Sequence, residues 1–250
     1  MSYQQHYTAP PPAYDAEANQ PLMGGNETDD IFKVVNSSVD IRMQFVRKVY
    51  SILSVQLLST AILSSIYMYN ISIKSWVQSN PWLLLVSGIG SLGVLFLLMW
   101  KARSTPLNYY LLALFTMLEG HLVGTVVTFY DKEIVLQALI ITLGVFVGLT
   151  LFTLQSKWDF SGMAPFLFAG LSILLLAGIV QIFIPFSETF QLALAVGGVI
   201  LFSCYIIFDT YLIFNQYSPE DYIMASVSLY MDFINLFLRV LQILNAMQRD

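Results

Sequence analysis

The sequence has few charged residues, few histidines and one cysteine, and each shortage excludes a class of protein. Only 11% of its 250 residues are Asp, Glu, Lys or Arg, less than half of the roughly 25% found in a soluble globular domain. The single cysteine, Cys204, excludes an intramolecular disulfide. The two histidines, His6 and His121, fall short of the three or four ligands of a zinc hydrolase. No basic stripe indicates a nucleic-acid partner.

Hydrophobic residues make up 57% of the chain and gather in long runs. A helix needs about 20 apolar residues to cross roughly 30 Å of hydrocarbon. Seven runs meet that length: Val49–Tyr69, Trp82–Trp100, Leu107–Tyr130, Ile134–Leu154, Met163–Ile184, Thr189–Phe214 and Tyr222–Met247. Aromatic residues lie near many of their ends, as at membrane interfaces. The sequence therefore predicts an all-α polytopic membrane bundle of about seven transmembrane helices, or six if one run is re-entrant.

The start of the chain has a different composition. Residues 1–30 are rich in proline, glutamine, asparagine and acids, and such a segment cannot bury enough apolar surface to offset the entropy of ordering. We therefore predict a disordered, proline-rich cytosolic tail over residues 1–40 and a seven-helix transmembrane domain over residues 41–250. Asp40 is the predicted N-cap of the first helix.

A short motif in the tail suggests a protein partner. Pro11, Pro12 and Tyr14 form a P-P-x-Y element. Segments of this kind dock on the aromatic grooves of WW domains as preformed extended helices. A ubiquitin ligase with WW domains is therefore a candidate partner of the tail.

The basic residues between the runs predict the orientation in the bilayer. If the N-terminus is cytosolic, six of them lie on that side: Arg42, Arg47, Lys48, Lys101, Arg103 and Lys157. The opposite side then holds Lys74, Lys132 and Arg249. Because cytosolic loops carry the excess of lysine and arginine, we expect a cytosolic N-terminus and, for seven spans, a C-terminus on the opposite side.

Two aspartates lie within the last two runs. A short turn at Ser218-Pro219 joins these runs, so they should form antiparallel neighbouring helices, with Asp209 and Asp232 each about 15–18 Å of helix from the turn. Two carboxylates that meet in a low dielectric cannot both ionise cheaply, so one is expected to hold a proton. The pair is then either a cytosolic proton sensor or two polar residues that bridge helices.

Other polar residues in the runs also need an explanation, because a charge in the hydrocarbon costs at least about 2.5 kcal/mol. Glu119 lies near the middle of its run and either lines a pore or bonds to a neighbouring helix. Asp232, Asn235 and Arg239 share one face of the last helix. Arg239 either pairs with a carboxylate or extends toward the membrane surface. His121 is predicted to be packed and neutral.

Motifs of enzymes are absent or out of place in the sequence. Gly88, Gly90 and Gly93 match G-x-G-x-x-G only inside an apolar run without a preceding strand. Close helix packing explains them better, as it does the pairs Gly120/Gly124 and Gly144/Gly148. No G-x-S-x-G elbow is present. The two membrane aspartates leave an aspartyl protease as the strongest enzyme alternative, but neither follows a Gly-x-Gly segment, and we expect no enzyme.

From Arg42 to its end the chain resembles the Bax-inhibitor-motif (lifeguard) family, and most of all its Golgi anti-apoptotic protein branch. The matching stretches are FVRKVYSILSVQLL (45–58), FYDKEIVLQALIIT (129–142), GLTLFTLQSKWDFS (148–161), FDTYLI (208–213) and SPEDYIMASVSLYMDFINLF (218–237). The resemblance implies a seven-helix bundle that leaks Ca²⁺ from internal stores and dampens cell-death and stress signalling.

The resemblance also implies roles for particular residues. Asp209 in FDT and Asp232 in YMDFINLF stand where the family has a pH-sensitive latch on its pore. A basic residue after the second span partners the latch in a bacterial relative, and Arg103 or Lys101 matches it here. That relative has a glutamate in its second span, where this chain has GIGSLG, so Glu119 is the candidate substitute.

The leading hypothesis is therefore a pH-sensitive Ca²⁺ leak channel in an internal membrane, of the Golgi, the endoplasmic reticulum or a vacuole. No cofactor is expected; Ca²⁺ is the transported ion, bound transiently by Asp209 and Asp232 with help from Asn235, since hard cations prefer oxygen ligands. The alternative is a non-conducting regulator of cell death that acts through protein partners.

Overall fold

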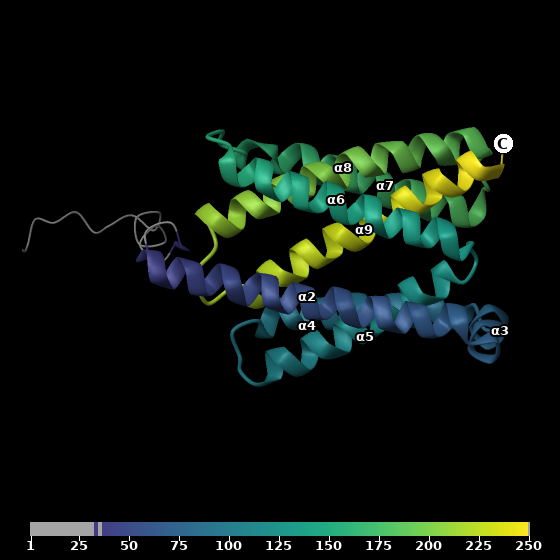
Figure 1. Cartoon of the computed structure of the whole chain (residues 1–250), viewed down its shortest axis with the longest axis horizontal. Coiled ribbons are helices and arrows are strands. Elements are labelled where there is room, and N and C mark those ends of the chain that lie inside the picture. The colour runs from purple at the N-terminus through teal and green to yellow at the C-terminus, as the bar shows by residue number, and fades with distance from the viewer. Residues whose placement is uncertain (1–32, 35–36, 250) are drawn as a thin grey trace, which may run out of the picture.

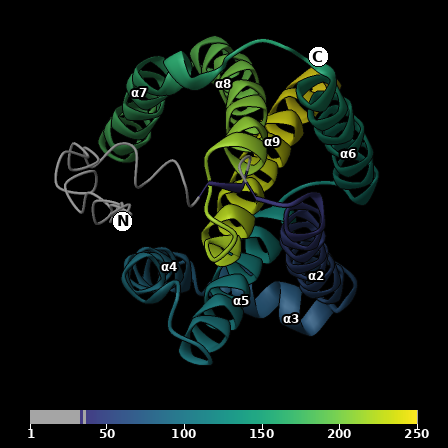
Figure 2. The same ribbon diagram turned by 90° about the vertical axis from the view of Figure 1, so that its left-hand side faces the viewer.

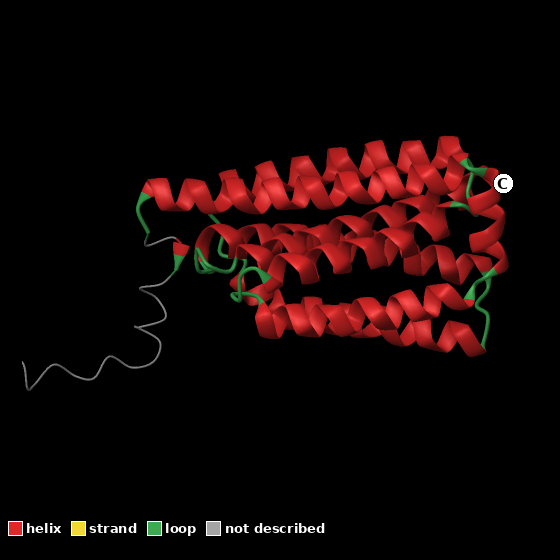
Figure 3. Cartoon of the chain, turned by 90° about the horizontal axis from the view of Figure 1, so that it is seen from below, coloured by secondary structure: helices red, strands yellow, loops and turns green. Residues whose placement is uncertain are grey.

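The computed structural model describes residues 33–34 and 37–249, and within them all regular structure is helical (Figure 3). The elements are α2 (Val39–Tyr69), α3 (Ile71–Ser79), α4 (Trp82–Lys101), α5 (Leu107–Val127), α6 (Lys132–Gln155), the 3₁₀ turn η3 (Ser161–Met163), α7 (Ala164–Phe183), α8 (Glu188–Asn215) and α9 (Tyr222–Arg249). The P-P-x-Y element of Pro11, Pro12 and Tyr14 lies outside the described residues, as does most of the predicted tail.

Seven of the described helices are long and apolar enough to cross a membrane, which confirms the predicted seven-helix bundle. They are α2, α4, α5, α6, α7 together with η3, α8 and α9. The helices lie side by side along one axis, as transmembrane spans do (Figure 1). The protein is therefore an integral membrane protein with seven spans.

The first span begins earlier than the apolar run predicted. Helix α2 starts at Val39, and its N-cap is Ser38, whose hydroxyl accepts a hydrogen bond from the Ile41 amide at 3.4 Å. Asp40, the predicted N-cap, lies in the first turn instead. A hydroxyl that satisfies a free N–H at the helix start stabilises this boundary, so the helix begins two residues before the start that Asp40 as N-cap predicted.

A second difference concerns the connection after the first span. The predicted break there contains helix α3, which lies at the end of the bundle (Figure 1). Asn70 caps it by accepting a hydrogen bond from the Ile73 amide at 3.1 Å. Nine residues are too few to cross a bilayer, so α3 does not change the count of spans.

Helix α9 occupies the centre of the bundle, and the other spans surround it. It packs against α8 and α6 on one side and against α2 and α5 on the other (Figure 2). More than half of its apolar window, 56%, is buried inside the protein, against 6% for the span that contains α7. Helix α9 is therefore shielded by the other spans, whereas the span that contains α7 lies at the periphery of the bundle.

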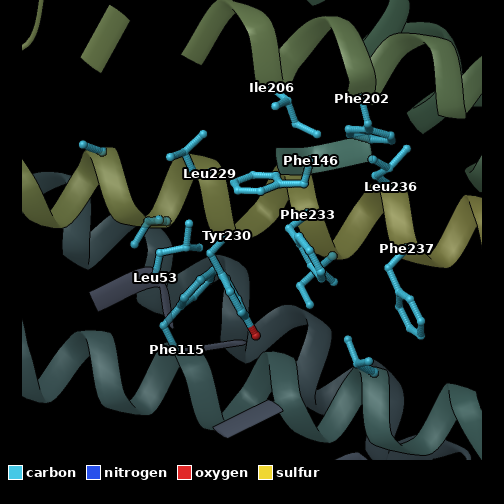
Figure 4. Close-up of a cluster of buried hydrophobic side chains, with 14 of the residues drawn as sticks. Leu53, Phe115, Phe146, Phe202, Ile206, Leu229, Tyr230, Phe233, Leu236 and Phe237 are labelled. Carbon is cyan, nitrogen blue, oxygen red and sulfur yellow. The ribbon is translucent and has the colours of Figure 1, made fainter. Parts of the chain in front are cut away.

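Aromatic side chains of α9 join the two halves of the bundle. Phe233 packs edge-to-face on Phe146 of α6, with ring centroids 5.5 Å apart, and Tyr230 packs in the same way on Phe115 of α5 at 6.1 Å (Figure 4). All four are buried. Such aromatic pairs contribute about 0.5–1.5 kcal/mol beyond the area that they bury, and here they fix the orientation of α9.

Side-chain hydrogen bonds connect α2 to its neighbours. The hydroxyls of Thr60 and Tyr230 lie 2.7 Å apart, and the Gln56 amide donates to Thr116 at 3.1 Å. Near the far end of α2, the Tyr67 hydroxyl lies 2.9 Å from Nδ1 of His121. His121 is therefore packed against a neighbouring helix, and it lies apart from the two aspartates of α8 and α9.

Only one of the two predicted small-residue pairs lies in a helix interface. A Cβ added at Gly120 would lie 3.1 Å from Leu63, and one at Gly124 would lie 3.1 Å from Tyr67, so α5 approaches α2 closely there. A Cβ at Gly144 or Gly148 would meet nothing within 4 Å. The prediction for the second pair is wrong, because its face of α6 points away from the other described helices.

Candidate functional site

The structure brings Asp209 of α8 and Asp232 of α9 together inside the bundle. Their carboxyl groups lie within hydrogen-bonding reach of each other, and the two residues are only 8% and 5% exposed. Helices α8 and α9 pack against each other along their length, which places the two aspartates at similar depth. Oxygen Oδ2 of Asp232 has no hydrogen-bond partner within the described part of the chain.

Hydroxyl groups lead from this pair toward the turn between α8 and α9. The Ser228 hydroxyl reaches the carboxyl group of Asp209, and the Tyr217 hydroxyl lies 3.5 Å from Oγ of Ser228. Tyr217 stands in the turn, outside the spans, and burial raises the pKa of its hydroxyl. The group thus keeps its proton at neutral pH. The three side chains form a polar path from the end of the bundle to the aspartates.

Neither of the two hydroxyl residues was predicted from the sequence. Ser228 precedes Asp232 by four residues, so the two share one face of α9, and this spacing would have found it. Tyr217 gave no comparable signal, because its position beside Ser228 depends on how the turn folds back. Tyr205 of α8 also lies close enough to both aspartates to interact with them electrostatically.

The predicted basic partners of the pair lie elsewhere. Arg103 donates from Nε and Nη2 to the two carboxylate oxygens of Asp221 at 2.8 and 2.9 Å, and Glu220 lies 4.0 Å away. The hydrogen bonds and charge of Asp221 raise the pKa of the Arg103 guanidinium. Lys101 stacks on the Trp100 ring at 4.4 Å. The bidentate acceptor in the α8–α9 turn thus holds Arg103 at the end of the bundle, away from the aspartate pair.

The other candidates on α9 also bond locally. The Asn235 amide donates to the Met231 carbonyl one turn earlier, at 2.8 Å. Arg239 donates to Gln242 at 3.1 Å, and its stem packs on Gly198 of α8, where a Cβ would lie 2.8 Å from Cγ of Arg239. The described residues give Arg239 no carboxylate partner, so the structure favours packing and extension of its long side chain over an ion pair.

Glu119 forms a second buried polar site, separate from the aspartates. It is 7% exposed and accepts a hydrogen bond from the Ser91 hydroxyl of α4. The two residues lie beside a largely apolar cavity of about 370 Å³ whose lining includes Gly88, Leu122 and Met231. The carboxyl group therefore bridges α4 and α5, and it also faces the space between them.

Substitutions of Glu119 separate the bridging role from the charge. We expect Glu119→Ala to lower the free energy of unfolding by about 1–2 kcal/mol, because it leaves the buried Ser91 hydroxyl without its acceptor. Glu119→Gln keeps a hydrogen-bond acceptor in a side chain of the same size. Its free energy of unfolding should lie within about 0.5 kcal/mol of the wild-type value. Thermal unfolding in detergent measures both. Equal losses in the two variants would show that the charge, and not the bridge, stabilises this interface.

The aspartate pair is a small ligand set for a cation. Calcium takes six to eight oxygen ligands, whereas no group of three or more His, Cys, Asp or Glu side chains comes together within residues 33–34 and 37–249. Asp209 and Asp232 supply two carboxyl groups; the backbone bond of Asn235 uses its side-chain nitrogen and not the oxygen, which is the atom that binds a cation. Within the described residues the pair thus supplies fewer acidic side chains than the number of oxygen ligands that calcium takes.

Similar proteins come from a fungus, an animal and a virus. Residues 42–250 match the model of a protein family described as inhibitor of apoptosis-promoting Bax1. The chain is 46% identical over 244 residues to Bax inhibitor 1 of Schizosaccharomyces pombe, covering 96% of this chain and 91% of the relative. It is 49% identical to Protein lifeguard 4 of Mus musculus, over 86% of this chain and 90% of the relative.

A viral relative extends this range. The chain is 44% identical over 213 residues to the Golgi anti-apoptotic protein of vaccinia virus (strain Lister), covering 85% of this chain and 90% of the relative. The names of the fungal and viral relatives refer to inhibition of Bax and of apoptosis, and none of the three names an enzyme activity.

Proposed function

We propose a function that proceeds from one premise: the chain belongs to the family of inhibitors of apoptosis-promoting Bax1. In this proposal the protein suppresses cell death from an internal membrane by letting Ca²⁺ leak from a store, at a rate set by pH. The name of the viral relative favours the Golgi as that membrane, and the positive-inside rule favours a cytosolic N-terminus.

The single observation that carries the proposal is the contact between Asp209 and Asp232 at the α8–α9 interface. Two carboxylates in contact repel when both are charged, and a shared proton removes that repulsion. Deprotonation therefore favours separation of the two groups, and protonation favours the packed arrangement. Because α9 lies at the centre of the bundle, a change in its packing against α8 alters contacts with several helices.

The hydroxyls of Tyr217 and Ser228 support this mechanism. A buried proton-sensitive pair needs a route by which protons reach it, and hydroxyl groups both donate and accept hydrogen bonds. The path from the α8–α9 turn through Ser228 to Asp209 supplies such a route. Protons would then enter from the side that holds the start of α2, which is the proposed cytosolic side.

Reconstitution of the full chain into liposomes that enclose a Ca²⁺-sensitive dye tests the proposal. We expect the rate of Ca²⁺ entry to change by about tenfold between pH 6 and pH 8. A change of about 1.4 kcal/mol in the free-energy difference between the packed and separated arrangements of the aspartates has this effect. Protein-free liposomes are the control. Absence of flux at every pH in this range would contradict the channel and favour the alternative, a non-conducting regulator that acts through protein partners.

A further inference from the structure

A cavity of about 630 Å³ opens at the end of the bundle where α2 begins. Its walls come from the first turns of α2, from the end of α6 with the loop that follows it, and from the last turns of α8. These three segments meet at one end of the molecule (Figure 1). Because all three are ends of membrane spans, the cavity lies at the level of the lipid headgroups.

Two cations line this cavity. Arg42 comes from α2 and Lys157 from the loop after α6. Neither forms an ion pair within the part of the chain that the structure describes, in contrast to Arg103, which is held by Asp221. Unpaired cations at a membrane surface attract anionic headgroups, with about 1 kcal/mol for each lysine or arginine.

The cavity also has one anion and a polar floor. Asp159 accepts a hydrogen bond from the Ser161 amide at 2.8 Å. This bond, and to a smaller extent a bond from the Tyr211 hydroxyl, lowers the pKa of the Asp159 carboxyl group. A carboxylate has about four acceptor positions, so Asp159 keeps capacity for hydroxyl donors. Thr210, which also lines the cavity, is fully buried.

Apolar side chains continue from the polar wall toward the bilayer. Met43 and Val46 of α2, with Leu154 of α6 and Phe214 of α8, line the same cavity. Trp158, at the mouth, is 73% exposed, which suits a tryptophan at the boundary between headgroups and hydrocarbon. A ligand that fits has a polar anionic end and an apolar end, which is the form of a phospholipid.

We propose that this cavity binds the headgroup of a phosphoinositide, with Arg42 and Lys157 on its phosphates and Asp159 on its inositol hydroxyls. The size agrees, since ligand sites span about 300–1,000 Å³. A headgroup with only phosphate would leave the carboxylate opposed to a like charge, whereas an inositol ring offers it hydrogen-bond donors. Charge, polarity and position thus favour an anionic lipid whose headgroup also carries several hydroxyl donors. This site is separate from the aspartate pair and does not depend on the proposed channel function.

Native mass spectrometry of the full chain in detergent tests the site. The probes are dioctanoyl phosphatidylinositol 4-phosphate, dioctanoyl phosphatidylcholine and the soluble headgroup inositol 1,4-bisphosphate. We expect the phosphoinositide to bind more tightly than either of the others. The double variant Arg42→Gln/Lys157→Gln should weaken binding of the phosphoinositide by about 25-fold, because loss of each cation lowers the affinity by about fivefold.

Matched variants make the result specific. Arg47→Gln/Lys101→Gln removes the same charge from residues outside the cavity and should change the affinity by less than about twofold, within the usual range of exposed substitutions. Arg42→Lys/Lys157→Arg keeps the charge and should retain most of the binding. Equal loss in both charge-removing pairs, unchanged affinity after loss of Arg42 and Lys157, or equal binding of phosphatidylcholine would each overturn the proposal. Equal binding of the soluble headgroup would assign the cavity to free phosphates and overturn the lipid site.

Discussion

Asp232→Asn is expected to abolish the pH dependence of Ca²⁺ flux, with rates at pH 6 and pH 8 that agree within about twofold. Asparagine has nearly the size of aspartate and keeps a polar group toward Asp209, so the packing of α8 on α9 should persist. Only one carboxyl group remains, so the repulsion between two anions cannot arise at any pH. Flux from dye-loaded liposomes, measured across the pH range in the same preparation as the wild type, gives the result.

The control for this substitution is Asp131→Asn, which removes an equal charge from an exposed position. Asp131 precedes α6, and its side chain makes no capping hydrogen bond. Its pH profile should match that of the wild type. A wild-type profile in Asp232→Asn as well would refute a gate based on the pair, while flux itself could still be present. The test thus separates the gating mechanism from conduction.

Gly124→Leu is expected to lower the free energy of unfolding by about 1–3 kcal/mol, the usual cost of overfilling a packed interface. The Cβ atom alone would lie 3.1 Å from the Tyr67 ring and 3.5 Å from Cα of Ser64. The second contact is with backbone, which cannot move aside as the end of a flexible side chain does. Helices α2 and α5 would have to separate. Thermal unfolding in detergent or nanodiscs measures the loss.

Gly148→Leu is the matched control, since it makes the same change at a position with open space around it. Both substitutions replace a helical glycine within a span, so the difference between them reports packing alone. We expect Gly148→Leu to change stability by less than about 0.5 kcal/mol. Equal destabilisation would mean that the close approach of α2 and α5 at Gly124 is not what stabilises this pair of helices.

Much of the fold follows from the sequence because the bilayer imposes a simple requirement. Backbone groups in hydrocarbon must be satisfied within the segment, so a long apolar run becomes a helix. The seven spans could be counted for this reason. The N-cap of α2 was predicted two residues too late, at Asp40, because the hydroxyl of Ser38 sets that boundary. Helix α3 was missed because a short interfacial helix has no long apolar run.

The site was predictable where it depends on position along neighbouring helices. A short turn joins α8 and α9, so equal distances from it placed Asp209 and Asp232 at one depth. Contacts between segments that are distant in sequence were not predictable in this way. Arg103 bonds to Asp221, 118 residues away, and Glu119 bonds to Ser91. Which acceptor a long side chain reaches depends on how helices that are not neighbours in sequence pack.

The sequence by itself determined that the chain forms seven spans and carries two acids in the last two, because hydrophobic length and turn position are local properties. The tertiary structure alone decided that α9 lies at the centre, that Gly124 and not Gly148 meets another helix, and that Arg42 and Lys157 share one cavity. These facts depend on which face each helix turns toward its neighbours. In a span that is apolar on all sides, hydrophobic pattern does not specify that face, because lipid and protein interior are equally apolar.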